Sequence, residues 1–153
     1  MTLREGQQAP EFSLANQDGE TVSLAGLRGR RVVLYFYPKD DTPGCTAEAC
    51  GIRDQFPRFE AQDAVVLGVS PDSVTSHKKF QEKYSLPFTL LADTEHEAAE
   101  AYGVWGEKKM YGKTYMGVNR TTFVIDEEGK IERIFEKVTP AEHADELVQA
   151  LGG

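Results

Sequence analysis

The run at 32–37 reads Val-Val-Leu-Tyr-Phe-Tyr and contains only aliphatic and aromatic side chains. A run without polar alternation is typical of a strand that other parts of the chain cover on both faces. A polar turn at 38–42 follows, and then Pro43, a residue suited to the first turn of a helix. This order of strand, turn and helix restricts the chain to folds in which helices pack against a sheet.

The rest of the chain alternates between strand-like and helix-like patterns. Further strands are predicted at 11–14, 21–24, 64–70, 88–91, 121–126 and 130–135, and helices at 46–59, 73–84, 94–102 and 140–151. Pro57 is expected to kink or end its helix. The polar, glycine-containing segment 106–117 is expected to be a loop. These elements predict an α/β fold with a mixed central sheet, helices on both faces and an N-terminal hairpin.

Length and charge limit the classes of function. A chain of 153 residues with 40% hydrophobic residues can bury a core without disulfides or a structural metal ion. Residues 1–153 are therefore expected to form a single domain. The net charge of -8 argues against nucleic acid or an anionic membrane surface as a partner. No apolar run is long enough for a signal peptide or a membrane span. We therefore expect a cytoplasmic protein.

The chain has two cysteines, Cys45 and Cys50, too few for a secreted disulfide scaffold. Cys45 falls at a predicted helix N-terminus, where free backbone N–H groups and the helix dipole favour an anion. A free cysteine has a pKa of about 8.5, so a reactive thiolate at neutral pH also needs a cation. Arg120, at the start of a predicted strand, is the leading candidate. The alternative is that Cys45 is an inert, small apolar residue.

The neighbours of Cys45 allow two interpretations. Thr42 could place its hydroxyl beside the sulfur, or it could serve only as a helix cap. Cys50 lies five residues further on, about 7.5 Å along a regular helix, so a disulfide would require the helix to unwind. This spacing does not match Cys-x-x-Cys redox or zinc motifs. The three histidines, His77, His96 and His143, are expected to be exposed on separate helices. No metal site is predicted.

The pattern Pro38-x-x-x-Thr42-x-x-Cys45 resembles the active-site signature of peroxiredoxins. The spacing Cys45-x-x-x-x-Cys50 resembles that of the bacterioferritin comigratory protein (PrxQ) subfamily. The resemblance extends over nearly the whole chain and implies a thioredoxin-like fold. It includes the segments 6–14, 102–105 and 120–126.

The resemblance implies a thiol peroxidase that reduces hydrogen peroxide and organic hydroperoxides. Cys45 would attack the terminal peroxide oxygen, which gives a sulfenic acid and water or an alcohol. Thr42 and Arg120 would bind and orient the peroxide and stabilise the charge on the leaving oxygen. Pro38 would shield the sulfur from solvent, and the backbone amides of Gly44 and Cys45 would donate to the peroxide.

The resemblance also implies how the enzyme is recycled. Cys50 would resolve the sulfenic acid as an intramolecular disulfide, which thioredoxin or a similar dithiol protein would reduce, without a bound cofactor. Glu48 could hydrogen-bond Arg120 and fix its orientation, or it could be an exposed helix carboxylate. A monomer is favoured over a decamer.

Two other classes of function are compatible with the two thiols. A redox sensor could use oxidation of Cys45 and Cys50 as a conformational signal without turnover. A thioredoxin-like disulfide reductase is a second alternative. The four-residue gap between the cysteines disfavours it, as do Thr42 and Arg120.

Overall fold

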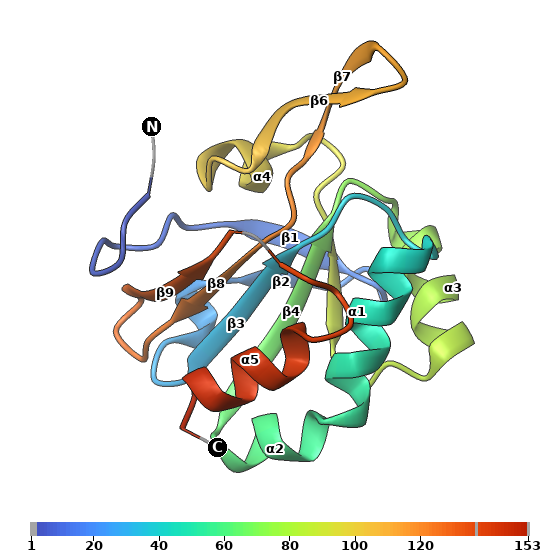
Figure 1. The fold of residues 1–153 in the computed structure, drawn as a ribbon. Helices are drawn as coiled ribbons and strands as arrows, with labels where there is room; N and C mark the ends of the chain where they lie inside the picture. The colour runs from blue at the N-terminus through green and yellow to red at the C-terminus, as the bar shows by residue number, and fades with distance from the viewer. Residues whose placement is uncertain (1–2, 137, 153) are drawn as a thin grey trace.

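A computed structural model describes residues 3–136 and 138–152 (Figure 1). Its main sheet has seven strands in the order β2-β1-β5-β4-β3-β8-β9. The strands are β1 (Ser13–Asn16), β2 (Thr21–Ser23), β3 (Arg31–Phe36), β4 (Ala64–Ser70), β5 (Thr89–Ala92), β8 (Thr121–Ile125) and β9 (Ile131–Phe135). The helices are α1 (Pro43–Asp54), α2 (Phe56–Ala61), α3 (Val74–Tyr84), α4 (Glu97–Ala101) and α5 (His143–Ala150), with a 3-10 turn at Ala25–Leu27.

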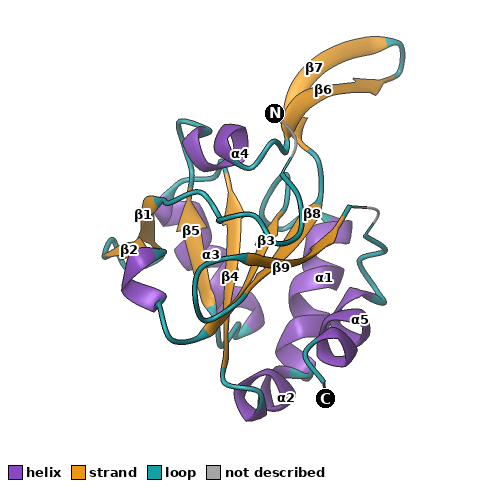
Figure 2. Cartoon of the chain, turned by 90° about the vertical axis from the view of Figure 1, so that its left-hand side faces the viewer, coloured by secondary structure: helices purple, strands orange, loops and turns teal. Residues whose placement is uncertain are grey.

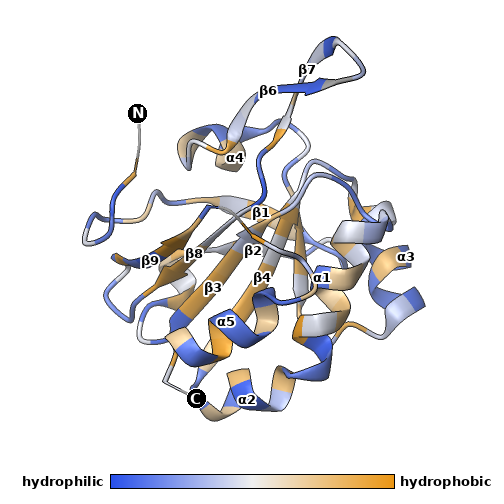
Figure 3. Ribbon diagram, viewed as in Figure 1, coloured by the Kyte–Doolittle hydropathy of each residue, from blue (hydrophilic) through white to orange (hydrophobic). Residues whose placement is uncertain are grey.

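The central strand β3 divides the interior into two apolar cores, one on each face of the sheet. Its alternate side chains Val33 and Tyr35 pack with residues of α1, α2, α3 and α5. The intervening Leu34 and Phe36 pack with residues of α4 and the N-terminal segment. The strongly apolar β3 and β4 therefore lie in the middle of the molecule (Figure 3). The predicted mixed sheet with helices on both faces, and the N-terminal hairpin β1–β2, are confirmed.

The pairing of β3 determines which segments meet at its carboxyl end. β3 runs parallel to β4 and antiparallel to β8, with Phe36 opposite Thr121. The end of β3 therefore lies beside the start of β8. The turn that leads into α1 follows the end of β3, and Arg120 immediately precedes the start of β8. Two segments that are far apart in the sequence are thus brought to the same edge of the sheet.

Two predictions about local structure were inaccurate. The segment predicted as a loop forms a hairpin, β6 (Trp105–Met110) and β7 (Lys113–Val118), which projects from the body (Figure 2). Tyr111 and Gly112 form its turn with positive φ values of 52° and 76°. The helix predicted at 46–59 is interrupted. α1 ends at Asp54, and α2 begins at Phe56 with Pro57 in its first turn. No described helix is long and apolar enough to cross a membrane.

Candidate active site

Cys45 lies in the first turn of α1, and only 1% of its surface is exposed. The first i→i−4 bond of α1 runs from the Thr46 amide to the Thr42 carbonyl. The amides of Gly44 and Cys45 precede this bond and lie outside the helical ladder, at the end where the helix dipole is positive. The sulfur is thus nearly removed from solvent at a point where backbone N–H groups favour a negative charge.

Arg120 connects Cys45 to a buried carboxylate. Its Nη2 donates to Cys45 Sγ at 3.2 Å, and its Nη1 donates to Glu48 Oε1 at 2.6 Å. Cys45 and Glu48 are three residues apart on α1 and share one face of the helix, so a single guanidinium reaches both. Burial opposes the charge of Arg120, but Glu48 and Cys45 outweigh it and raise the pKa of the guanidinium. Arg120 is therefore a fixed cation at the sulfur.

Glu48 is fully buried, so of the two alternatives for this residue the exposed helix carboxylate is wrong. Burial raises its pKa from 4.5 to about 7, although the ion pair with Arg120 opposes this rise. Its second oxygen, Oε2, has no hydrogen-bond partner among the described residues, and neither does the buried hydroxyl of Tyr35. The fold thus holds the Glu48 carboxyl in a buried place where burial disfavours its charged form.

Gly44 leaves room for the guanidinium. A Cβ at this position would lie 3.3 Å from Arg120 Nη2 and 3.7 Å from Cγ of Pro140. Contacts near 3.3 Å are tighter than a methyl group normally makes, so a side chain here would displace Arg120 from the sulfur. The glycine before Cys45 therefore has a packing role as well as a backbone role.

Thr42 is the N-cap residue of α1, but its side chain makes no capping hydrogen bond. Its hydroxyl instead donates to the Lys39 carbonyl at 2.9 Å, which leaves the oxygen lone pairs free to accept. Thr42 and the half-buried Pro38 line a pocket of about 480 Å³, together with Trp105 and Met116. This pocket borders the turn that leads into Cys45.

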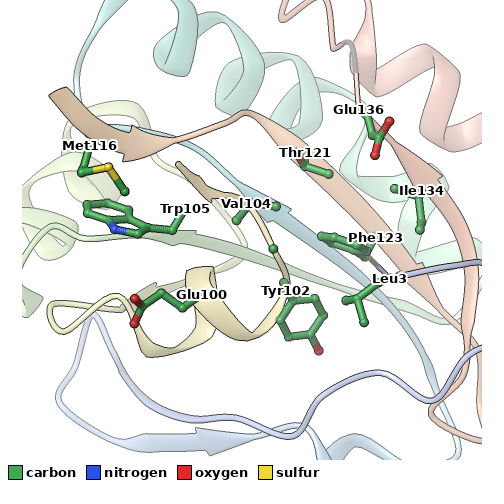
Figure 4. A pocket seen from close by; sticks show the side chains of 11 residues that line it. Leu3, Glu100, Tyr102, Val104, Trp105, Met116, Thr121, Phe123, Ile134 and Glu136 are labelled. Atoms are coloured by element: carbon green, nitrogen blue, oxygen red, sulfur yellow. The ribbon is translucent and has the colours of Figure 1, made fainter. Parts of the chain in front are cut away.

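A second hollow has a volume of about 570 Å³ (Figure 4). It shares Trp105 and Met116 with the first pocket, and its other lining residues include apolar Val104 and Phe123 and acidic Glu100 and Glu136. Neither Cys45 nor Arg120 is among the described residues that line either hollow, but Pro38 and Thr42 line the smaller one. The smaller pocket is therefore the one beside the turn that leads into Cys45.

Comparison with known proteins identifies the family. The model of the AhpC/TSA family matches residues 5–134. The chain belongs to this family. It is 52% identical to Peroxiredoxin Bcp of Bacillus subtilis (strain 168) over 151 residues, which cover 99% of this chain and 96% of the relative. It is 47% identical to Peroxiredoxin Bcp of Escherichia coli (strain K12), over 97% of this chain and 96% of the relative.

Solved structures give the same result. Peroxiredoxin Q of Xanthomonas campestris superposes with a TM-score of 0.88 at 40% identity, covering 92% of this chain and 89% of that one. A cysteine-to-serine mutant of Xylella fastidiosa PrxQ superposes with a TM-score of 0.93 at 33% identity, covering 99% and 97%. The resemblance to PrxQ peroxiredoxins and the thioredoxin-like fold are therefore confirmed. The protein is a peroxiredoxin, a thiol peroxidase of the oxidoreductase class.

In this peroxiredoxin Cys50 is a half-buried free thiol on the same helix as Cys45. Both residues lie within the continuous α1, so their separation along the axis is about 7.5 Å. A disulfide between them cannot form while the helix is intact. The structure is thus that of the reduced peroxiredoxin, in which α1 holds the thiols apart.

The prediction that the three histidines are exposed was wrong, because His77 and His143 are fully buried and His96, just before α4, is half-buried. His77 has a polar partner at each ring nitrogen, Asp40 Oδ2 at 2.7 Å and the Leu91 carbonyl at 2.8 Å. His143 lies 2.7 Å from the hydroxyl of Thr122. Burial lowers the pKa of His143. These partners come from distant segments, so the helical pattern around each histidine did not indicate its burial.

Asp40, Asp72 and His77 bring potential metal-ligand atoms within 4.8 Å of one another. Each is already engaged in this structure, since Asp40 accepts from Tyr37 and His77, and Asp72 accepts from Ser70. The cluster connects the turn before Thr42 to α3. We interpret it as the support of that turn.

Lys108 was missed by the sequence analysis. It lines the pocket beside Thr42, and it lies on β6, in the segment predicted as a loop. Half-buried Lys108 alternates with exposed Glu107 and Lys109 in β6, but all three residues are charged, so nothing in the sequence distinguished Lys108.

Proposed function

We propose that this peroxiredoxin reduces hydrogen peroxide and organic hydroperoxides by attack of the Cys45 thiolate on the terminal peroxide oxygen. The new bond joins sulfur to oxygen, the O–O bond breaks, and the leaving oxygen takes a proton to become water or an alcohol. The observation that supports this most strongly is the 3.2 Å contact between Arg120 Nη2 and the almost fully buried Cys45 Sγ. In a site of low dielectric, one fixed cation stabilises both the thiolate and the leaving oxygen.

The other site residues have proposed roles that follow from their positions. The Thr42 oxygen, whose proton is directed at Lys39, accepts the hydrogen of the protonated peroxide. The amides of Gly44 and Cys45 donate to the peroxide oxygens, and Pro38 keeps water from the sulfur. Arg120 would bind both peroxide oxygens in the transition state, where the negative charge passes from sulfur to oxygen.

Cys50 is proposed to complete the cycle. Its thiol condenses with the Cys45 sulfenic acid, which forms the disulfide and releases water. Because both residues lie in α1, the helix must unwind between them. A dithiol protein such as thioredoxin then supplies the two electrons and two protons that restore both thiols. We propose that a monomer carries out this cycle, since both cysteines come from one helix.

The mass of the intact protein after one equivalent of hydrogen peroxide tests this function. We expect the natural chain to lose two hydrogens, Cys50→Ser to gain one oxygen at Cys45, and Cys45→Ser to remain unchanged. With thioredoxin, thioredoxin reductase and NADPH, the natural chain should turn over and Cys50→Ser should stop after one turnover. Peroxide consumption by Cys45→Ser at the natural rate would refute the assignment. A disulfide that forms but is not recycled would favour the redox sensor.

A further inference from the structure

Lys108 extends from the projecting hairpin toward the site. It is half-buried in the pocket that Pro38 and Thr42 line, whereas the adjacent Lys109 is exposed. Its Nζ donates to the Val118 carbonyl at 2.8 Å. Val118 ends β7 and precedes Arg120 by two residues. The ammonium is therefore held at the end of the hairpin that leads into the catalytic strand.

Gly117 leaves the space that the Lys108 side chain occupies. A Cβ on Gly117 would lie 3.0 Å from Cδ and 3.8 Å from Cγ of Lys108. Real Cβ atoms rarely come that close to another carbon, so any side chain at 117 would push the lysine stem aside. The absence of a side chain at Gly117 thus leaves room for the stem of Lys108, whose ammonium reaches the Val118 carbonyl.

The charge around this pocket differs from that of the whole chain. The chain carries a net charge of -8, yet two lysines, Lys39 and Lys108, line the pocket. None of the described residues that line it is an aspartate or a glutamate. A positive pocket in an acidic protein favours whatever negative charge develops there.

We infer that Lys108 is a second fixed cation of the Cys45 site, positioned by Gly117, which favours the thiolate and the negatively charged leaving oxygen. This role rests on the proposed peroxidase chemistry and extends it to a residue of the hairpin. Lys108 acts through space on the sulfur and through the Val118 carbonyl on the segment that carries Arg120. It is a positioning and electrostatic residue, and its side chain makes no bond with Cys45.

The groups around Lys108 act on its charge in opposite directions. Burial is the main cause that lowers the pKa of Lys108 and the charge of Arg120 adds to it, while Cys45 raises it. Lys39, His96 and the Tyr115 hydroxyl are the other titratable groups that line this pocket.

The test measures thiolate reactivity without peroxide. In a Cys50→Ser background, the rate at which iodoacetamide alkylates Cys45 is followed from pH 4 to pH 9 for four proteins: the parent, Lys108→Met, Lys108→Arg and Lys109→Met. We expect Lys108→Met to move the pH midpoint upward and to lower the rate below it by about threefold, the effect of one charge in a partly solvated site. Lys108→Arg should stay near the parent, and Lys109→Met should match it.

Gly117→Ala tests the space that Gly117 leaves for Lys108. It should lower the alkylation rate in the same direction, and it should have no further effect in Lys108→Met, because the two changes act through one side chain. Equal curves for the parent and Lys108→Met would refute the inference, as would equal losses in Lys108→Arg and Lys108→Met. If the parent fails to react with peroxide, the proposed function fails independently of these alkylation curves.

Discussion

The buried carboxyl of Glu48 should make the stability of the fold depend on pH in an unusual direction. Its pKa is raised from 4.5 to about 7, and burial is the main cause. The folded state therefore holds this proton more tightly than the unfolded state does. The contribution to stability is fully present below pH 4.5 and is lost as the pH rises through 7. Glu48→Gln, which carries no ionisable group, should lack this dependence.

The magnitude follows from the two pKa values. One pH unit corresponds to about 1.4 kcal/mol, so the full difference amounts to about 3 kcal/mol. Between pH 5 and pH 8 the free energy of unfolding should fall by about 2.5 kcal/mol more in the parent than in Glu48→Gln. The side chain is fully buried, so solvent does not screen this effect. Other groups, such as His143, titrate in both proteins and cancel in the difference.

Urea unfolding at pH 5, 6, 7 and 8 measures this difference. Both proteins should carry Cys45→Ser and Cys50→Ser, which removes thiol titration and oxidation. Glu60→Gln, which removes an exposed carboxyl in α2, is the matched control and should keep the slope of the parent. Parallel stability curves for the parent and Glu48→Gln would show that the folded protein ionises Glu48 without cost, and would refute the reasoning.

Two further predictions concern the cation at the sulfur and the support of the catalytic turn. Arg120→Lys should slow the reaction of Cys45 with peroxide by about 10²-fold in stopped-flow measurements, because an ammonium cannot donate to two partners in the planar geometry of a guanidinium; a rate within twofold of the parent would contradict this. Asp40→Ala should lower the free energy of unfolding by about 1–3 kcal/mol, because it leaves the buried His77 ring nitrogen and Tyr37 hydroxyl without a hydrogen-bond partner. The exposed Glu60, changed to Gln, is again the control for urea unfolding and should leave the midpoint unchanged.

The parts of the fold that the sequence predicted correctly are those whose burial follows a local pattern. The continuous apolar runs of β3 and β4 identified the centre of the sheet, because only a strand covered on both faces lacks polar residues. The hairpin β6–β7 has the opposite composition. It projects from the body, so polar residues occur on both of its faces, and no alternation with a core side marked it as paired strands.

The site shows the same division. Thr42 and Cys45 are close in sequence, so a short motif is sufficient to relate them to one another. Glu48 allowed two interpretations from sequence, since nothing on α1 shows that a guanidinium from the start of β8 lies against it. The burial of His77 depends in the same way on Asp40 and on the Leu91 carbonyl. Sequence patterns indicate which residues are reactive, but the pairing of β3 with β8 determines which charges meet.

Glu48 also connects the ionisation of the site to the movement proposed for Cys50. It lies between the two cysteines, so we expect unwinding of α1 between them to bring this carboxyl into water. In water its pKa returns toward 4.5, and the free energy that penalises the folded state above pH 7 should therefore favour unwinding. The disulfide-forming step should become faster with rising pH by more than the ionisation of the attacking thiol explains.

Glu48→Gln isolates this effect. The rate of disulfide formation after a pulse of peroxide can be followed by acid quench, thiol alkylation and mass measurement, in the parent and in Glu48→Gln. Ionisation of Cys50 is common to both proteins, so the ratio of their rates reports on Glu48 alone. The pH-dependent contribution of Glu48 amounts to about 2.5 kcal/mol, so the ratio of the parent rate to the variant rate should rise by about tenfold or more between pH 5 and pH 8. A ratio that stays constant over this range would mean that Glu48 remains buried while the disulfide forms, and that α1 unwinds only beyond it.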